Sequence, residues 1–235
     1  MIVIKRSPVP ENLKTGKSKT TKKYSARDVV TALHEMQYGK CCYCECKISD
    51  EGHEKAVEHF HPQSIFVNLV NDWDNLLLAC AQCNGKKSDE FPVLLSTHTK
   101  APKVLYLRRA ARKRRLLIDP SDPKDDDPEK HLAFVINDSD AELGLVKPRR
   151  NSERGKATID VTGIYRTCYV LARRQHLYKL IIMYVKLLEA YDDGDEEMVE
   201  VWFNSIRQAT NDAAPYAALA REFFRVKKIS ERFGK

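Results

Sequence analysis

Six of the seven cysteines of this chain fall into two short clusters whose spacing is that of a metal site. Cys41 and Cys44 form one Cys-x-x-Cys pair, and Cys80 and Cys83 form another, with 35 residues between the pairs. A tight turn directs both thiolates of a pair at one ion, and two pairs make a closed tetrahedral zinc site. Because four thiolates leave zinc no open coordination position, we expect this zinc to be structural.

Other roles for these cysteines are less well supported. Cys42 and Cys46 are spare and could compete for the ion, although Gly39 and the Cys-x-x-Cys spacing favour Cys41 as the ligand. An odd number of cysteines argues against a disulfide framework. A second pair argues against the redox role that a single Cys-x-x-Cys can have.

Between and just after the pairs lie side chains suited to phosphodiester hydrolysis, which needs a base for the attacking water and a divalent ion on the phosphate. His59, with an ordinary pKa of about 6.5, can accept the proton of that water at neutral pH. Glu58 and Asn84 offer the hard oxygen ligands that Mg²⁺ or Mn²⁺ prefers. Asn75 is expected to support the His59 loop through hydrogen bonds rather than to react.

These residues also have ordinary structural explanations. A Glu–His pair is common on protein surfaces, and Asn84 could simply cap a helix. His61 could contact phosphate or be exposed, and the sequence leaves both open. Lys87 is a candidate phosphate contact. It is their combination within one short segment that favours catalysis.

Charge is sorted into blocks along a chain with 40 basic and 33 acidic residues and a formal net charge of +7. Residues 100–115 carry eight basic side chains and no acidic one, which predicts phosphate contact, with a solvated face as the alternative. Residues 119–129 carry six acids and one lysine and are expected to form a solvated loop. The candidate nucleic-acid contacts in the basic block are Arg108, Arg109, Arg112, Lys113, Arg114 and Arg115.

A small α+β framework is expected to position these groups. Short strands are predicted over 55–60 and 75–80, and a helix from Cys83. A β-hairpin is predicted over 131–136 and 142–146, followed by a loop over 147–156. We therefore expect a nuclease domain over residues 1–160, with a core finger over 31–100 and an extension over 101–160.

The last part of the chain, 161–235, is predicted to be a helical domain. Its first helix is broken by Asp192-Asp-Gly-Asp195, and two shorter helices follow around Trp202 and Phe223. Spacings of three and four residues indicate a buried stripe on the long helix. The residues of that stripe are Ile164, Cys168, Leu171, Leu177, Ile181, Tyr184, Leu188 and Tyr191.

Length and composition fit a soluble globular protein. The 235 residues suffice for one large or two small domains, and 43% hydrophobic with 31% charged residues is not the composition of a disordered chain. No apolar stretch approaches the roughly 20 residues that span a bilayer. The N-terminus is not that of a signal peptide, so a cytoplasmic location is expected.

Residues 38–92 resemble the HNH nuclease family, whose β-β-α metal finger presents an acid–His pair, an Asn on the second strand and His or Asn on the helix. Here these are Glu58-His59, Asn75 and Asn84, although the family most often has Asp before the His and often has His on the helix. A wider resemblance links the chain to the HNH component of Septu-type two-gene anti-phage systems, including retron-linked versions. The short segments that carry this wider resemblance are Tyr43-Cys44-Glu45, Trp73-Asp74-Asn75-Leu76, Phe91-Pro92, Leu117-Ile-Asp119-Pro120 and Pro128-Glu129.

The resemblance implies a metal-dependent endonuclease, with DNA favoured as substrate, that serves anti-phage defence. It also implies an ABC-like ATPase partner that holds or gates the nuclease, with the C-terminal helices as docking surface. In retron-linked versions a reverse transcriptase and its nucleic acid would join them. Two alternatives stay open: the same nuclease acting on RNA such as tRNA, and a non-catalytic zinc-finger adaptor that binds nucleic acid or the partner.

Overall fold

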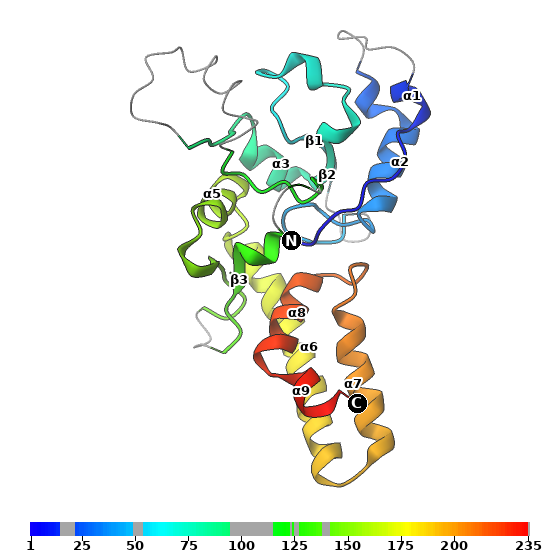
Figure 1. Cartoon of the computed structure of the whole chain (residues 1–235), viewed down its shortest axis with the longest axis vertical. Coiled ribbons are helices and arrows are strands. Elements are labelled where there is room, and N and C mark those ends of the chain that lie inside the picture. Colours follow the sequence, from blue (N-terminus) through cyan, green and yellow to red (C-terminus); the bar gives the residue numbers. More distant parts are fainter. Residues whose placement is uncertain are drawn as a thin grey trace.

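The computed structural model describes residues 1–14, 22–48, 54–94, 115–122, 124, 127–137 and 142–234. These residues form helices and two small antiparallel sheets, which confirms the predicted α+β class. Figure 1 shows the first sheet with α2 and α3 at one end of the molecule and a helical hairpin at the other.

The first sheet and its neighbouring helices carry both cysteine pairs. β1 (Lys55–His59) and β2 (Leu76–Cys80) pair antiparallel, as predicted, and α3 (Ala81–Lys87) follows β2 directly. The helix therefore begins two residues before Cys83, where the sequence placed its start. α2 (Arg27–Met36) packs against β2, and every residue of β2 is buried, as the apolar run Leu-Leu-Leu-Ala requires.

The N-terminal residues run along this finger. Ile2 and Ile4 are buried, and the Ile4 amide donates to the carbonyl of Pro120 at 2.7 Å. α1 (Glu11–Lys14) lies close to α2. The segment thus adds apolar side chains to the core of the finger.

The extension consists of a second sheet and a helix. β3 (Leu132–Phe134) and β4 (Val146–Pro148) form the predicted hairpin, with the second strand beginning at residue 146 instead of 142. The loop predicted over 147–156 is wrong at both ends, because residues 147–148 belong to β4 and α5 (Glu153–Thr162) begins at residue 153. Its N-cap is Ser152, whose Oγ accepts a hydrogen bond from the Gly155 amide at 3.1 Å, so the start of α5 is stabilised by a side chain that also suits loops.

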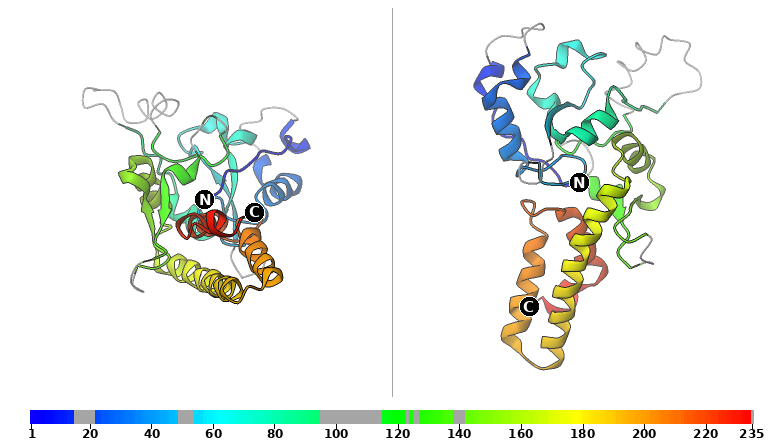
Figure 2. Two further views of the ribbon diagram at one scale, coloured as in Figure 1. Left: turned by 60° about the horizontal axis from the view of Figure 1, so that its bottom comes forward. Right: turned by 180° about the vertical axis from the view of Figure 1, so that it is seen from behind.

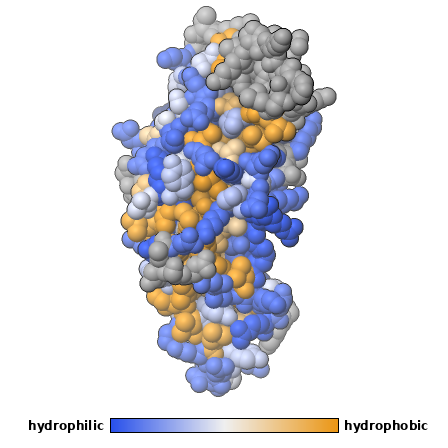
Figure 3. Space-filling view, turned by 90° about the vertical axis from the view of Figure 1, so that its left-hand side faces the viewer, coloured by the Kyte–Doolittle hydropathy of each residue, from blue (hydrophilic) through white to orange (hydrophobic). Residues whose placement is uncertain are grey.

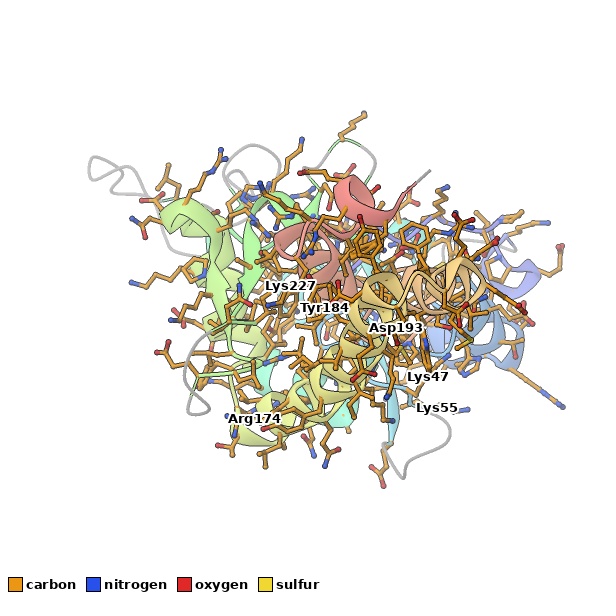
Figure 4. The ribbon with its side chains drawn as sticks, turned by 90° about the horizontal axis from the view of Figure 1, so that it is seen from below. Lys47, Lys55, Arg174, Tyr184, Asp193 and Lys227 are labelled. Atoms are coloured by element: carbon orange, nitrogen blue, oxygen red, sulfur yellow. The ribbon has the colours of Figure 1, made fainter. Side chains whose placement is uncertain are left out.

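The C-terminal part is helical, as predicted. α6 (Thr167–Asp192) and α7 (Glu196–Ala209) form a hairpin whose turn lies at the predicted break, and α8 (Ala217–Val226) and α9 (Ile229–Phe233) pack against it (Figure 2). Seen from below, Lys227 lies beside Tyr184 of α6, with its Nζ 5.9 Å from the ring centroid (Figure 4).

The buried face of α6 differs in part from the predicted stripe. Leu177 is buried as expected, whereas Cys168, Leu171 and Tyr191 are exposed. The helix carries apolar residues around most of its circumference, so their spacing does not determine which of them face the interior. The buried residues of α6 are Tyr169, Val170, Arg173, Leu177, Leu180, Leu187 and Ala190.

Buried apolar side chains form two groups. The larger group joins the finger, the second sheet and α5, and the smaller one lies among α6 to α9. α6 belongs to both, with Tyr169 in the first group and Leu177 in the second. The domain boundary between 160 and 161 stays a prediction, and none of the described helices is long and apolar enough to cross a membrane.

Candidate functional site

The four predicted zinc ligands lie together. The Sγ atoms of Cys41, Cys44, Cys80 and Cys83 are all within 4.8 Å of one another, and all four side chains are buried. Cys44 and Cys80 Sγ are 3.9 Å apart, close to the roughly 3.8 Å that separates thiolates around tetrahedral zinc with Zn–S bonds of about 2.3 Å. The residues present therefore fit a structural zinc ion.

Hydrogen bonds to the backbone of Leu78 hold the first cysteine pair against β2. The side chain of Gln37, just after α2, donates to the carbonyl of Leu78 at 2.8 Å and accepts from its amide at 2.8 Å. The Cys42 amide also donates to the Leu78 carbonyl, at 2.9 Å. Of the two spare cysteines, Cys46 lies near the metal ligands, with its Sγ 3.2 Å from that of Cys44.

Glu58 and Lys87 form a buried ion pair. Lys87 Nζ is 2.6 Å from Glu58 Oε1 and 3.0 Å from the carbonyl oxygen of His59, so it ties α3 to the end of β1. Burial raises the pKa of Glu58 to about 7, although Lys87 and the Tyr43 hydroxyl favour its charged form. Lys87 is only 1% exposed, so the predicted phosphate contact would require it to leave this ion pair.

His59 is held by one carbonyl group. Its Nε2 is 2.9 Å from the Val70 oxygen, and the ring of Tyr24 packs edge-on against it with centroids 4.6 Å apart. Because a carbonyl can only accept, Nε2 carries the hydrogen and the lone pair is on Nδ1. Burial lowers the pKa of His59, which keeps the imidazole neutral at pH 7.

Asn75 binds the loop that follows His59. Its Oδ1 accepts from the His61 amide at 2.7 Å and lies 2.9 Å from His61 Nδ1, while its Nδ2 donates to the carbonyls of His61 and Leu69 at 3.1 Å. The His61 ring packs among the rings of Phe60, Phe66 and Phe91. His61 thus sits inside an aromatic cluster rather than standing free at the surface.

Asn84 lies on α3 directly after the zinc ligand Cys83 and is half-buried, whereas Cys83 is fully buried. One turn further on, Lys87 contacts both Glu58 and the His59 backbone. α3 therefore carries a zinc ligand, the candidate ion ligand Asn84 and the partner of Glu58 within five residues.

The turn that bears Asn75 is clamped by Arg6. The guanidinium donates to the carbonyls of Trp73 at 2.6 Å, Leu76 at 2.7 Å and Asp74 at 2.9 Å. It also donates to Ser121 Oγ at 2.7 Å. No sequence motif points to this residue, because its partners, three backbone carbonyls and the Ser121 hydroxyl, lie 67 to 115 positions away.

Comparison with known proteins matches residues 41–90 to the model of the HNH endonuclease family. Residues 41–90 form an HNH endonuclease domain. The chain is also 39% identical over 95 residues to the Septu protein PtuB of Bacillus thuringiensis, covering 37% of each chain. It is 30% identical over 158 residues to the Septu protein PtuB of Bacillus mycoides (strain KBAB4), covering 61% of this chain and 48% of that one. The chain thus spans less than half the length of these curated relatives.

The HNH domain offers few further metal ligands. Among the described residues, the four cysteines are the only group of three or more His, Cys, Asp or Glu side chains close enough to hold an ion. Glu58 and Asn84 would thus give a catalytic ion two protein ligands. That number fits Mg²⁺, which keeps several waters and binds substrate phosphates.

Most of the predicted basic block, Arg108 to Arg114, lies outside the described residues. Arg115 is described, and its Nη2 is 2.6 Å from Asp122 Oδ2 in the acidic segment that follows. Its guanidinium also lies 5.3 Å from the ring centroid of Phe60. Arg115 thus joins the basic and acidic segments to the HNH domain, and its predicted phosphate contact would have to compete with Asp122.

Sequence reasoning missed one contact of the zinc centre. The hydroxyl of Tyr169, on the first turn of α6, lies within hydrogen-bond reach of Cys80 and Cys83. The HNH motifs end long before this residue, so no spacing rule could have connected it to the cysteines.

Proposed function

We propose that this chain is a metal-dependent HNH endonuclease that hydrolyses phosphodiester bonds, with DNA as the favoured substrate. The observation that carries the proposal is the arrangement of the HNH domain. The buried four-cysteine centre fixes the start of α3 beside the start of β1, where the Ala81 amide donates to the Glu54 carbonyl. The other end of the helix meets the end of the strand, through Lys87, Glu58 and the His59 carbonyl, and Asn84 lies between the two contacts.

In this proposal His59 is the general base. Its Nδ1 lone pair accepts the proton of the attacking water, while the Nε2–H bond to the Val70 carbonyl fixes the tautomer and the orientation of the ring. Asn75 keeps the following loop in place through its contacts with His61. The lowered pKa of His59 keeps the base in its neutral, active form at pH 7.

Glu58 and Asn84 would hold a Mg²⁺ or Mn²⁺ ion. When bound, such an ion neutralises charge on the phosphate and on the leaving oxygen. Lys87 pairs with the buried carboxyl group of Glu58 in the absence of the ion, which offsets the cost of burying a lone charge. The basic block over 100–115 would contact the sugar–phosphate backbone.

We place this activity in anti-phage defence, on the strength of the similarity to Septu PtuB proteins, and in the cytoplasm. An ABC-like ATPase is the proposed partner, and the link to a retron reverse transcriptase stays a prediction. The exposed face of α6 supports docking on the C-terminal helices. Apolar side chains at intervals of seven, four and three residues are 44–61% exposed there: Leu171, Tyr178, Ile182 and Val185.

The space-filling view in Figure 3 shows apolar residues gathered in patches on one face of the molecule, with hydrophilic residues between the patches. An apolar stripe along a single helix is suited to packing against a helix of another protein. Exposed charged residues flank this stripe at Lys179, Lys186 and Glu189.

Incubation of the purified chain, with and without the ATPase, with plasmid DNA and total RNA in Mg²⁺ or Mn²⁺ tests the proposal. Cleavage of DNA that disappears in His59→Ala and with EDTA supports it, and cleavage of RNA alone establishes the RNA alternative. The adaptor alternative would be established by binding without cleavage, together with full phage protection by His59→Ala and Asn84→Ala variants that retain zinc.

A further inference from the structure

The first turn of α6 reaches the zinc centre from outside the HNH domain. Tyr169 is 3% exposed, and its hydroxyl oxygen lies 3.2 Å from Cys83 Sγ and 3.3 Å from Cys80 Sγ. Zinc-bound cysteines are thiolates, which can only accept. A phenol with an ordinary pKa of about 10 keeps its hydrogen at neutral pH, so in the zinc-bound protein Tyr169 is the donor.

Arg166 completes this contact. Its Nη2 donates to the Tyr169 hydroxyl oxygen at 3.2 Å and to the carbonyl of Gln82, between the two cysteines of the second pair, at 3.0 Å. Its guanidinium also lies 5.1 Å from the ring centroid of Tyr169. The phenol therefore accepts from a cation and donates toward the sulfurs, which strengthens it as a donor.

The charge of the zinc centre explains why a hydrogen-bond donor and a cation, Tyr169 and Arg166, lie beside it. Four thiolates around one Zn²⁺ carry a formal charge of −2, in a site whose sulfur ligands are all buried. Hydrogen bonds to the sulfurs and a nearby guanidinium offset that charge. Metal sites in proteins commonly depend on such partners, which orient the ligands and tune their basicity.

We infer that Tyr169, supported by Arg166, is an outer-shell partner of the zinc centre and positions α3 from the side of the C-terminal helices. It is a positioning residue, because it touches the zinc ligands and not the reacting atoms. Its effect reaches Asn84 through Cys83, the preceding residue of α3. The part that concerns Asn84 rests on the proposed nuclease function, whereas the part that concerns zinc does not.

The variant Tyr169→Phe tests the inference, since it removes the hydroxyl and keeps the ring. Tyr165→Phe is the matched control, because Tyr165 precedes α6 by two residues and is 45% exposed. Zinc affinity is measured by competition with a chromophoric chelator, and the sulfur-to-metal charge-transfer band is recorded after substitution with Co²⁺. We expect zinc affinity to fall about 10- to 100-fold in Tyr169→Phe, the band to shift, and both to stay unchanged in Tyr165→Phe.

Arg166→Gln keeps the test informative if Tyr169→Phe does not fold, and should weaken zinc binding in the same direction. Where the wild-type chain cleaves nucleic acid, Tyr169→Phe should lower kcat with little change in KM. Loss of zinc affinity in a chain that never cleaves would overturn the nuclease proposal and leave this inference standing. Zinc affinity and a Co²⁺ spectrum equal to those of wild type in both variants would overturn the inference itself.

Discussion

Substituting Asn84 by alanine should abolish cleavage without disturbing the zinc centre, and its neighbour Cys83 provides the contrast. Cys83 is fully buried with its Sγ among the four clustered sulfurs, whereas Asn84 is half-buried on the next position of α3. The two substitutions affect adjacent residues of the same helix. They should nevertheless fail in different ways.

The expected magnitudes follow from these environments. Structural zinc contributes on the order of 10 kcal/mol of apparent binding free energy in small zinc domains, which is comparable to the whole stability of a domain. Cys83→Ala should therefore release zinc and unfold the finger. Asn84→Ala should change the free energy of unfolding by less than about 1 kcal/mol, because alanine favours helix by up to about 0.7 kcal/mol. For a chain of this size that shifts Tm by no more than about 4 °C.

Bound zinc, thermal unfolding and plasmid cleavage in Mg²⁺ measure the three properties separately. Asn84→Ala should keep its zinc and its Tm and lose at least about 100-fold in cleavage rate. Gly85→Ala is the control, because a methyl group there meets nothing within 4 Å and should leave all three properties close to wild type. Cleavage by Asn84→Ala at the wild-type rate, with zinc retained, would show that this side chain does not hold the catalytic ion.

Three further outcomes are expected. Arg6→Met removes the clamp on the turn that bears Asn75 and should lower the free energy of unfolding by about 2 to 4 kcal/mol, whereas Lys5→Met, at an exposed site, should change it by less than about 0.5 kcal/mol; equal denaturation midpoints for both would contradict this. Changing Arg108, Arg109, Arg112 and Lys113 to Ser should reduce the log–log salt slope of nucleic-acid binding by about three, and an unchanged slope would identify the block as a solvated face. Because burial raises the pKa of Glu58 to about 7 and lowers that of His59, the cleavage rate at limiting Mg²⁺ should fall as the pH drops through about 7, where Glu58 takes up a proton, and saturating Mg²⁺ should move that fall to lower pH; a fall at the same pH at both Mg²⁺ concentrations would contradict Glu58 as an ion ligand.

The parts of the fold that could be predicted are those set by neighbours in sequence. Each of three features can be predicted from a few neighbouring residues: the two Cys-x-x-Cys pairs, the apolar run of β2 and the break at 192–195. The prediction of a loop over 147–156 was wrong for a local reason too, because Ser152 is the N-cap of α5. The cap residue of a helix and a loop residue are drawn from the same amino-acid types.

The parts that could not be predicted depend on contacts between distant segments. Lys87 was expected to face phosphate, yet it is buried against Glu58, 29 positions away. Arg6 binds backbone carbonyls about 70 residues downstream, and backbone acceptors leave no signature in a sequence. For α6, nearly all sides are apolar, so the choice of buried face is made by the finger and by α7 and α8, not by periodicity.

The contacts of α6 along its length explain why that helix is apolar on more than one side. Its first turn is buried against the zinc centre through Tyr169, and its middle packs against α7 and α8 through Leu177 and Leu180, while its outer face exposes Tyr178 and Ile182. A helix of 26 residues is about 39 Å long and stiff. If the proposed ATPase docks on the outer face, any displacement of α6 that it causes acts directly on the sulfurs of Cys80 and Cys83, and therefore on the helix that carries Asn84. Gating of the nuclease by a partner then needs no contact between that partner and the reacting atoms.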